Sequence, residues 1–249
     1  MSKLLENTVE QAAIQWLQEQ GYRYIPGPDI RRPLKQVVLM DALRHFLQKT
    51  YPDIPQTAIE DALVQFTHPQ GQDLHYRNRD IHRKITMGID ITWKEKEKDK
   101  AAHLYPIDFE HPENNDFLCV NQMSIEGKNQ RRPDLIIFIN GLPLVLFEFK
   151  NMFDENATVE DAYNQIQHYK HDIPRLFEFN AITVISDGEE TYHGMFSAGR
   201  EWFAPWKSVD GRSIAEHEFP LKALIEGLVD QRPADRLYSQ LYLPRRPQR

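Results

Sequence analysis

In the first third of the chain, apolar residues recur at three- and four-residue intervals, which is the period of an amphipathic helix. Three such stretches cover residues 6–20, 33–49 and 55–66. Gly21 directly follows the first stretch, at a position where glycine commonly ends a helix. Pro33 opens the second, where its missing N–H is tolerated. The pattern therefore predicts a largely helical N-terminal part.

The hydrophobic period then changes from helical to alternating. Over residues 84–94, every second residue is apolar, which predicts a strand with one buried and one solvated face. Residues 94–100 follow with charges of both signs, which predicts a solvated hairpin tip. We expect further strands at 103–109 and 116–125.

Residues 135–149 form two nearly continuous apolar runs on either side of Asn140-Gly141. Runs of this kind are typical of strands that are buried on both faces. Asn-Gly between two such runs is a strong hairpin signal. The sequence therefore predicts a buried hairpin at the centre of a sheet.

After this hairpin, helical and strand patterns alternate toward the C-terminus. We expect a helix over 159–171 with Thr158 as its N-cap, and strands at 181–186 and near 191–196. The last predicted helices and the final linker cover residues 219–230, 234–242 and 243–249. The predicted fold is α/β or α+β, a mixed central sheet flanked by helices, with a main domain over 1–230 and a helix or linker over 231–249.

Composition excludes several classes of protein. The 249 residues carry a net charge of −7, which argues against a highly basic nucleic-acid coat protein but leaves room for a local basic groove. The single cysteine, Cys119, allows neither an internal disulfide nor a multi-cysteine zinc site. No apolar run approaches the length of a membrane span, and the N-terminus has no signal-peptide pattern. We therefore expect a soluble cytoplasmic protein with no membrane partner.

Three charged residues stand at the open end of the predicted buried hairpin. Asp134 precedes the first strand, while Glu148 and Lys150 close the second and share one face of it. If Asp134 lies opposite Glu148, Ile139 pairs with Pro143 across a three-residue loop. Two carboxylates so placed suit Mg²⁺ or Mn²⁺, and a neighbouring lysine suits phosphodiester hydrolysis. The same three residues also fit a structural ion-pair cluster at a sheet edge.

The context of these residues is more specific than the three charges alone. Residues 131–144, RRPDLIIFINGLPL, followed by 147–150, FEFK, closely resemble the nuclease motif of the R (motor) subunit of type I restriction endonucleases. That motif is a PD-(D/E)xK nuclease core. The resemblance covers residues 6–230 and is strongest over 105–170. It implies a restriction-endonuclease-like mixed central β-sheet flanked by helices.

The resemblance also implies roles for individual residues. Asp134, Glu148 and Lys150 correspond to the catalytic metal-site residues, and Gln165 with Tyr169 to a pair that orients the site or contacts DNA. Glu10 is a weaker candidate for a further metal ligand, because related nucleases draw a carboxylate from an early helix, although Glu10 also fits an ordinary exposed glutamate on that helix. Independently of the family, Arg131 and Arg132 stand where basic side chains can contact phosphate oxygens, although they also fit ordinary surface arginines.

The resemblance further implies double-stranded DNA as substrate, and methyltransferase and specificity subunits as partners. A complete R subunit uses ATP in motor domains, whereas this sequence contains no Gly-x-x-x-x-Gly-Lys-Ser/Thr loop. We therefore expect a Mg²⁺- or Mn²⁺-dependent endodeoxyribonuclease domain, with ATP used only by motor domains absent from this sequence. Two alternatives stay open: a catalytically weak module that docks DNA or a partner, and a stand-alone repair-type nuclease.

Overall fold

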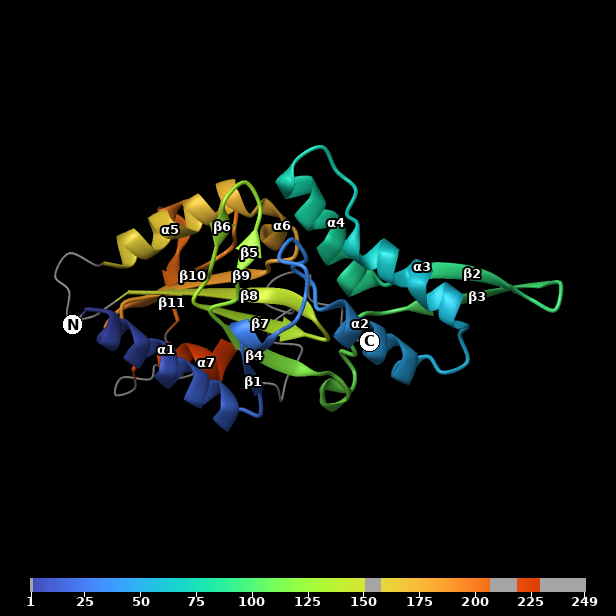
Figure 1. The fold of residues 1–249 in the computed structure, drawn as a ribbon, viewed down its shortest axis with the longest axis horizontal. Helices are drawn as coiled ribbons and strands as arrows, with labels where there is room; N and C mark the ends of the chain where they lie inside the picture. The colour runs from blue at the N-terminus through green and yellow to red at the C-terminus, as the bar shows by residue number, and fades with distance from the viewer. Residues whose placement is uncertain (1, 151–157, 207–218, 229–249) are drawn as a thin grey trace, which may run out of the picture.

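A seven-stranded mixed sheet forms the centre of the molecule (Figure 1). The computed structural model describes residues 2–150, 158–206 and 219–228. The strand order is β1-β4-β7-β8-β9-β10-β11. β1 and β4 are parallel, as are β8 and β9, and the other neighbouring pairs are antiparallel. The strands are β1 (Arg23–Pro26), β4 (Phe117–Asn121), β7 (Leu135–Ile139), β8 (Leu142–Phe149), β9 (Ile182–Ser186), β10 (Thr191–Gly194) and β11 (Ala204–Pro205).

Helices cover both faces of this sheet, which confirms the predicted fold class. In Figure 1, α5 (Val159–Asp172) and the short α6 (Pro174–Phe177) lie above the sheet, whereas α1 (Ser2–Glu19) and α7 (Pro220–Leu228) lie below it. Every residue of β7 and β8 is buried, as expected for a hairpin between other strands and two helical layers. No helix in the described ranges is both long and apolar enough to cross a membrane.

A second group of elements extends from one end of the sheet (Figure 1). It contains α2 (Met40–Thr50), α3 (Gln56–Thr67), α4 (Leu74–Met87) and the hairpin of β2 (Ile89–Glu95) with β3 (Lys98–Leu104). Lys96 and Glu97 form the tip of that hairpin with positive φ angles, and both are exposed. The predicted solvated tip is therefore confirmed.

Two small strands and three short 3-10 turns complete the described elements. They are β5 (Ile125–Glu126), β6 (Gln130–Arg131), Gly27–Asp29, Pro112–Asn114 and Arg200–Trp202. β5 and β6 pair with each other outside the main sheet. The expected continuous strand over 116–125 is thus wrong beyond Asn121, where Gln122 adopts a positive φ of 50° and interrupts the extended chain.

Three further boundaries differ from the sequence prediction. Residues 84–87 are helical rather than extended, because Ile81 and Ile85 share the buried face of α4 and the helix ends at Gly88, whose φ is 70°. Residues 33–39 are not helical, since Arg32 donates hydrogen bonds to the carbonyls of Pro33 (2.9 Å) and Gln36 (2.6 Å).

The strand expected over 103–109 ends at Leu104. Asp108 accepts hydrogen bonds from the backbone of Glu110 and His111 and thereby turns the chain. The helices predicted at 55–66 and 159–171 are confirmed as α3 and α5, and α1 confirms the one at 6–20. The expected elements at 234–242 and 243–249, and the proposed boundary at 230/231, lie outside the described residues.

Candidate active site

The register of the β7–β8 hairpin decides which side chains share a face at its open end. Asn140 (φ 49°) and Gly141 (φ 83°) form a two-residue turn of type I′, so Ile139 pairs with Leu142. A bulge then shifts the register, and Leu135 pairs with Phe147. The expected three-residue loop is wrong, but the expected register at the open end is confirmed. Leu144 is the extra residue of β8 that shifts the register between the turn and the open end of the hairpin.

The bulge places Asp134 and Glu148 on the same face of the sheet. A register that ran on from the turn without a bulge would set Asp134 opposite Phe147, with its side chain on the face opposite to that of Glu148. In the structure, the Phe149 N–H donates to Asp134 Oδ2 at 2.8 Å, which fixes this carboxylate beside the end of β8. Lys150 Nζ lies 3.2 Å from Glu148 Oε1. The three residues predicted from the sequence are therefore brought together.

Glu148 is an unusual carboxylate because only 3% of it is exposed. Burial raises its pKa well above the ordinary value, and the neighbouring Asp134 carboxylate raises it further. Lys150 and Tyr169 act in the opposite direction. Among the described residues, Glu148 Oε2 is buried without a hydrogen-bond partner. A buried carboxylate oxygen without a donor is costly unless something electropositive binds there.

Helix α5 brings Gln165 and Tyr169 to this carboxylate. Thr158 is the N-cap residue directly before this helix, and its N–H and Oγ1 both donate to the Asp161 carboxylate at 2.9 Å. Gln165 and Tyr169, four residues apart, share one face of the helix, and the Tyr169 side chain contacts both Gln165 and Glu148. Burial, followed by the charge of Glu148, raises the pKa of Tyr169, so its hydroxyl stays protonated. The expected proximity is confirmed, whereas a role in catalysis stays a prediction.

A second chain of contacts reaches Asp134 from the opposite side. Glu10 on α1 is buried and accepts hydrogen bonds from Asn121 Nδ2 and Gln122 Nε2, each at 2.6 Å. Gln122 Nε2 also lies 3.1 Å from Asp134 Oδ1, and its backbone N–H donates to the Asp134 carbonyl at 2.9 Å. Glu10 is thus connected to Asp134 through the amide of Gln122.

The two predicted arginines differ in their surroundings. Arg131 forms a salt bridge to the buried Asp172 at the end of α5, with Nε 2.6 Å from Oδ2. The hydrogen bond from Asn129, followed by the pairing with Arg131, lowers the pKa of Asp172. Arg132 is exposed. Arg131 is therefore held by an internal partner, and contact of either arginine with DNA stays a prediction.

The donor set fits a hydrated Mg²⁺ or Mn²⁺ better than a fully protein-bound ion. In the ranges that the structure describes, no three His, Cys, Asp or Glu side chains are grouped to hold a metal. Mg²⁺ is commonly bound through one or two carboxylates, with water and substrate phosphate completing its shell. Asp134 and the orphaned Oε2 of Glu148 offer such a pair. A metal-binding role for Glu10 stays a prediction.

Sequence reasoning assigned no role to Asn121 and Gln122, although both connect to the site. The available indication was two adjacent amides at the end of the buried strand β4, with Asn121 as its last residue and Gln122 directly after it. The positive φ of Gln122, which turns its side chain back toward Asp134, is not encoded in any local pattern.

Comparison with known proteins places this arrangement in a family. Residues 3–202 match the family described as "Type I restriction enzyme R protein N terminus (HSDR_N)". The chain is 35% identical over 239 residues to the "Type I restriction enzyme HindI endonuclease subunit" of Haemophilus influenzae, which covers 91% of the chain and 23% of that relative.

Two further relatives have corresponding names. A Methanocaldococcus jannaschii protein, provisionally named the MjaIXP endonuclease subunit of a type I restriction enzyme, is 31% identical over 226 residues, covering 86% of the chain and 22% of the relative. The type I restriction enzyme SauMSSORF170P endonuclease subunit of Staphylococcus aureus is 26% identical over 190 residues, which covers 75% of the chain and 19% of that relative. The chain thus spans less than a quarter of the length of these three relatives. It belongs to the family of type I restriction enzyme R protein N termini.

Proposed function

We propose that this chain is the metal-dependent DNA endonuclease domain of a type I restriction enzyme. The observation that carries the proposal is the shared face of Asp134, Glu148 and Lys150, set by the bulge in β8. Family membership and the endonuclease names of the relatives support the same reaction class.

The proposed reaction is hydrolysis of a DNA phosphodiester bond, in which a water oxygen bonds to phosphorus as the bond to the leaving oxygen breaks. Asp134 and Glu148 would hold Mg²⁺ or Mn²⁺, which lowers the pKa of a bound water and polarises a phosphoryl oxygen. The Lys150 side chain is 18% exposed, and its ammonium can stabilise the negative charge that develops on the phosphate. Tyr169 and Gln165 orient the Glu148 carboxylate from α5.

The relatives are much longer than this chain, and the proposal assigns further activities to their remaining length. Because the chain aligns with less than a quarter of each, we infer that ATP-driven translocation resides in motor domains outside this sequence. Double-stranded DNA is the proposed substrate, and methyltransferase and specificity subunits are the proposed partners. The cytoplasm, where such an enzyme meets DNA, is the proposed location.

The experiment compares DNA cleavage by the assembled restriction complex carrying this chain as wild type, Asp134→Asn or Glu148→Gln. We expect both variants to lose cleavage while they retain DNA binding and ATP hydrolysis. Asp53→Asn, a matched change at an exposed position, should cleave like wild type. Titration of Mn²⁺ into the chain should show binding that Asp134→Asn abolishes.

Three outcomes distinguish the proposal from its alternatives. Cleavage that persists in both variants would refute the assigned site. A wild-type complex that binds DNA without cutting it would favour a docking module. Cleavage that requires free DNA ends, with closed circles left intact, would favour a repair-type nuclease.

A further inference from the structure

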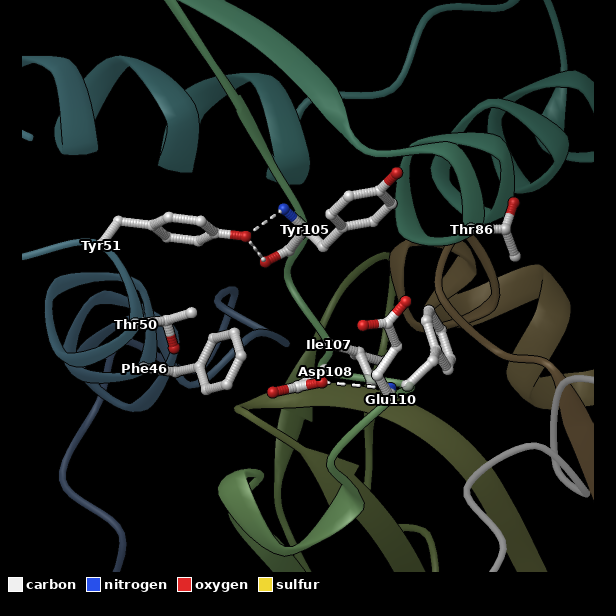
Figure 2. A pocket seen from close by; sticks show the side chains of 9 residues that line it. Phe46, Thr50, Tyr51, Thr86, Tyr105, Ile107, Asp108 and Glu110 are labelled. Carbon is white, nitrogen blue, oxygen red and sulfur yellow. Dashed lines mark hydrogen bonds between the residues drawn. The ribbon is translucent and has the colours of Figure 1, made fainter.

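A pocket of about 310 Å³ lies at the end of the sheet from which α2, α3 and α4 extend. Figure 2 shows it between the C-terminal ends of α2 and α4 and the segment that follows β3. This volume is at the lower end of the range of small-ligand pockets. The lining residues are Phe46, Thr50, Tyr51, Thr86, Tyr105, Ile107, Asp108, Phe109 and Glu110.

The pocket lies far from the candidate active site along the central hairpin. Asn140, in the turn of that hairpin, donates from Nδ2 to the Pro106 carbonyl at 2.9 Å and to Asn115 Oδ1 at 2.7 Å. These bonds hold the pocket segment against the turn end, whereas Asp134 and Glu148 stand at the open end. The two sites share no residue, so the pocket can be perturbed without changing the proposed nuclease residues.

Four aromatic side chains form much of the pocket wall. Phe46 is buried, Tyr51 and Phe109 are half-buried, and Tyr105 is 39% exposed. The backbone N–H of Tyr105 donates to the Tyr51 hydroxyl at 2.8 Å, which holds the Tyr51 ring against the chain at residue 105 (Figure 2). Burial raises the pKa of Tyr51, so this hydroxyl stays neutral. Aromatic faces carry partial negative charge and attract organic cations.

The formal charges of the pocket are negative as well. Asp108 and Glu110 are its two ionisable acids, and its lining contains no Lys, Arg or His. The Asp108 carboxylate is engaged, because it accepts from Glu110 N at 3.1 Å, His111 N at 2.9 Å and Asn114 Nδ2 at 2.8 Å. Within the part of the chain that is described, no salt bridge involves Glu110, whose carboxylate Figure 2 places among the rings.

Two helix ends add to this negative potential. α2 ends at Thr50, and Thr86 lies in the last turn of α4, so residues from the C-terminal turns of both helices line the pocket. Helix C-termini carry partial negative charge and favour cations. Lys49, the basic residue in the last turn of α2, is exposed and does not line the pocket. Aromatic walls, one available carboxylate and two helix ends therefore favour the same kind of ligand.

We propose that this pocket binds an organic cation, namely an alkylammonium or guanidinium group, whose charge pairs with Glu110 and whose apolar stem packs against Tyr51, Tyr105 and Phe109. A bare metal ion fits less well, because Glu110 alone offers an uncommitted carboxylate and most of the wall is carbon. The required group occurs both in free polyamines and in the lysine and arginine side chains of proteins.

The test is calorimetric titration of the 249-residue chain with agmatine, spermidine and N-acetyl-arginine methylamide. We expect millimolar or tighter binding of at least one cation, and no binding of neutral butanol. Glu110→Gln should weaken the binding at least fivefold, since it removes the charge at an exposed position and preserves the shape. Glu113→Gln, a matched change three residues away on the surface, should leave affinity unchanged.

The ligands also separate the two sources of the cation. Preferential binding of agmatine or spermidine would indicate a free polyamine, whereas preferential binding of the arginine methylamide would indicate a protein side chain. Absence of binding by all three would overturn the proposal. Equal weakening by Glu110→Gln and Glu113→Gln would also overturn it, because the effect would then reflect overall charge and not this pocket.

Discussion

Gln122 offers a sharp test of how the fold positions Asp134. Its side-chain amide bridges two carboxylates, with Nε2 2.6 Å from Glu10 Oε2 and 3.1 Å from Asp134 Oδ1. The substitution Gln122→Met keeps the length of the side chain and removes both hydrogen bonds. Each carboxylate keeps one neighbouring donor, from Asn121 and the Phe149 N–H respectively, so the chain should still fold.

The size of the effect follows from the two lost hydrogen bonds. A hydrogen bond to a charged group contributes about 1.5–3 kcal/mol when it is well shielded from water. Gln122 is only half-buried, and the bond to Asp134 is longer than the bond to Glu10. We therefore expect a loss of about 2 kcal/mol in the free energy of unfolding. The positive φ of residue 122 is present in both proteins and cancels in the difference.

Two measurements are needed to separate stability from function. Urea unfolding of the chain gives the stability difference, and DNA cleavage by the assembled complex at a temperature where both proteins are folded gives the effect on activity. Because Gln122 orients a proposed metal ligand, we expect cleavage to fall by about 10- to 100-fold. Raising the Mg²⁺ concentration should partly restore it, which a purely structural defect would not allow.

The same exchange at an exposed position provides the control. Gln130→Met on β6 removes an amide that forms no side-chain hydrogen bond in the described residues. It should change neither the free energy of unfolding nor DNA cleavage. The reasoning would be refuted if Gln122→Met had the same unfolding free energy and the same DNA cleavage activity as the wild type. A loss of stability with unchanged cleavage would restrict Gln122 to a structural role.

Three further predictions follow from buried or capping groups. Burial lowers the pKa of His82 to about 4, so the unfolded chain binds protons more readily below pH 6.5, and stability should fall by about 2 kcal/mol between pH 7 and pH 5. This part of the pH dependence should be missing from His82→Gln unfolding curves. Burial raises the pKa of Cys119 to about 12, so iodoacetamide at pH 8 should alkylate this thiol only after unfolding, and rapid labelling of the native chain would contradict its burial. Thr158→Ala should lower the free energy of unfolding by about 1 kcal/mol, because α5 loses its cap, while Thr158→Ser should preserve it.

The part of the fold that could be predicted is the part specified by local patterns. The continuous apolar runs around Asn140-Gly141 identified the central hairpin, since only strands covered on both faces tolerate such runs. The prediction of a strand from residue 84 is wrong, because Ile85 and Met87 belong to α4 and only by chance continue the apolar alternation of β2. Met87 is 64% exposed, and Gly88, where the helix ends, was the available sign of a boundary.

The candidate site shows the same division between local and distant information. The proximity of Gln165 and Tyr169 could be predicted because residues that are four positions apart lie on one face of a helix. The positions of Glu10 and Gln122 depend on the packing of α1 against the sheet and on a single positive φ. Strand β1 was missed for a similar reason: its four residues are stabilised by parallel pairing with β4, about a hundred positions away along the chain.

The bulge at Leu144 makes the length of this hairpin a functional quantity. Leu144 is fully buried, and its carbonyl accepts from the Ala181 N–H at 2.7 Å, so the neighbouring strand fixes the extra residue in place. Deletion of one residue between Leu142 and Phe147 would remove the bulge and keep Asp134 opposite Glu148, whereas insertion of one residue there would set Asp134 opposite Phe147 and turn Glu148 to the other face. Substitutions along this stretch alter packing by degrees, whereas a one-residue insertion is an all-or-none change. The hairpin therefore accepts new side chains more readily than one additional residue.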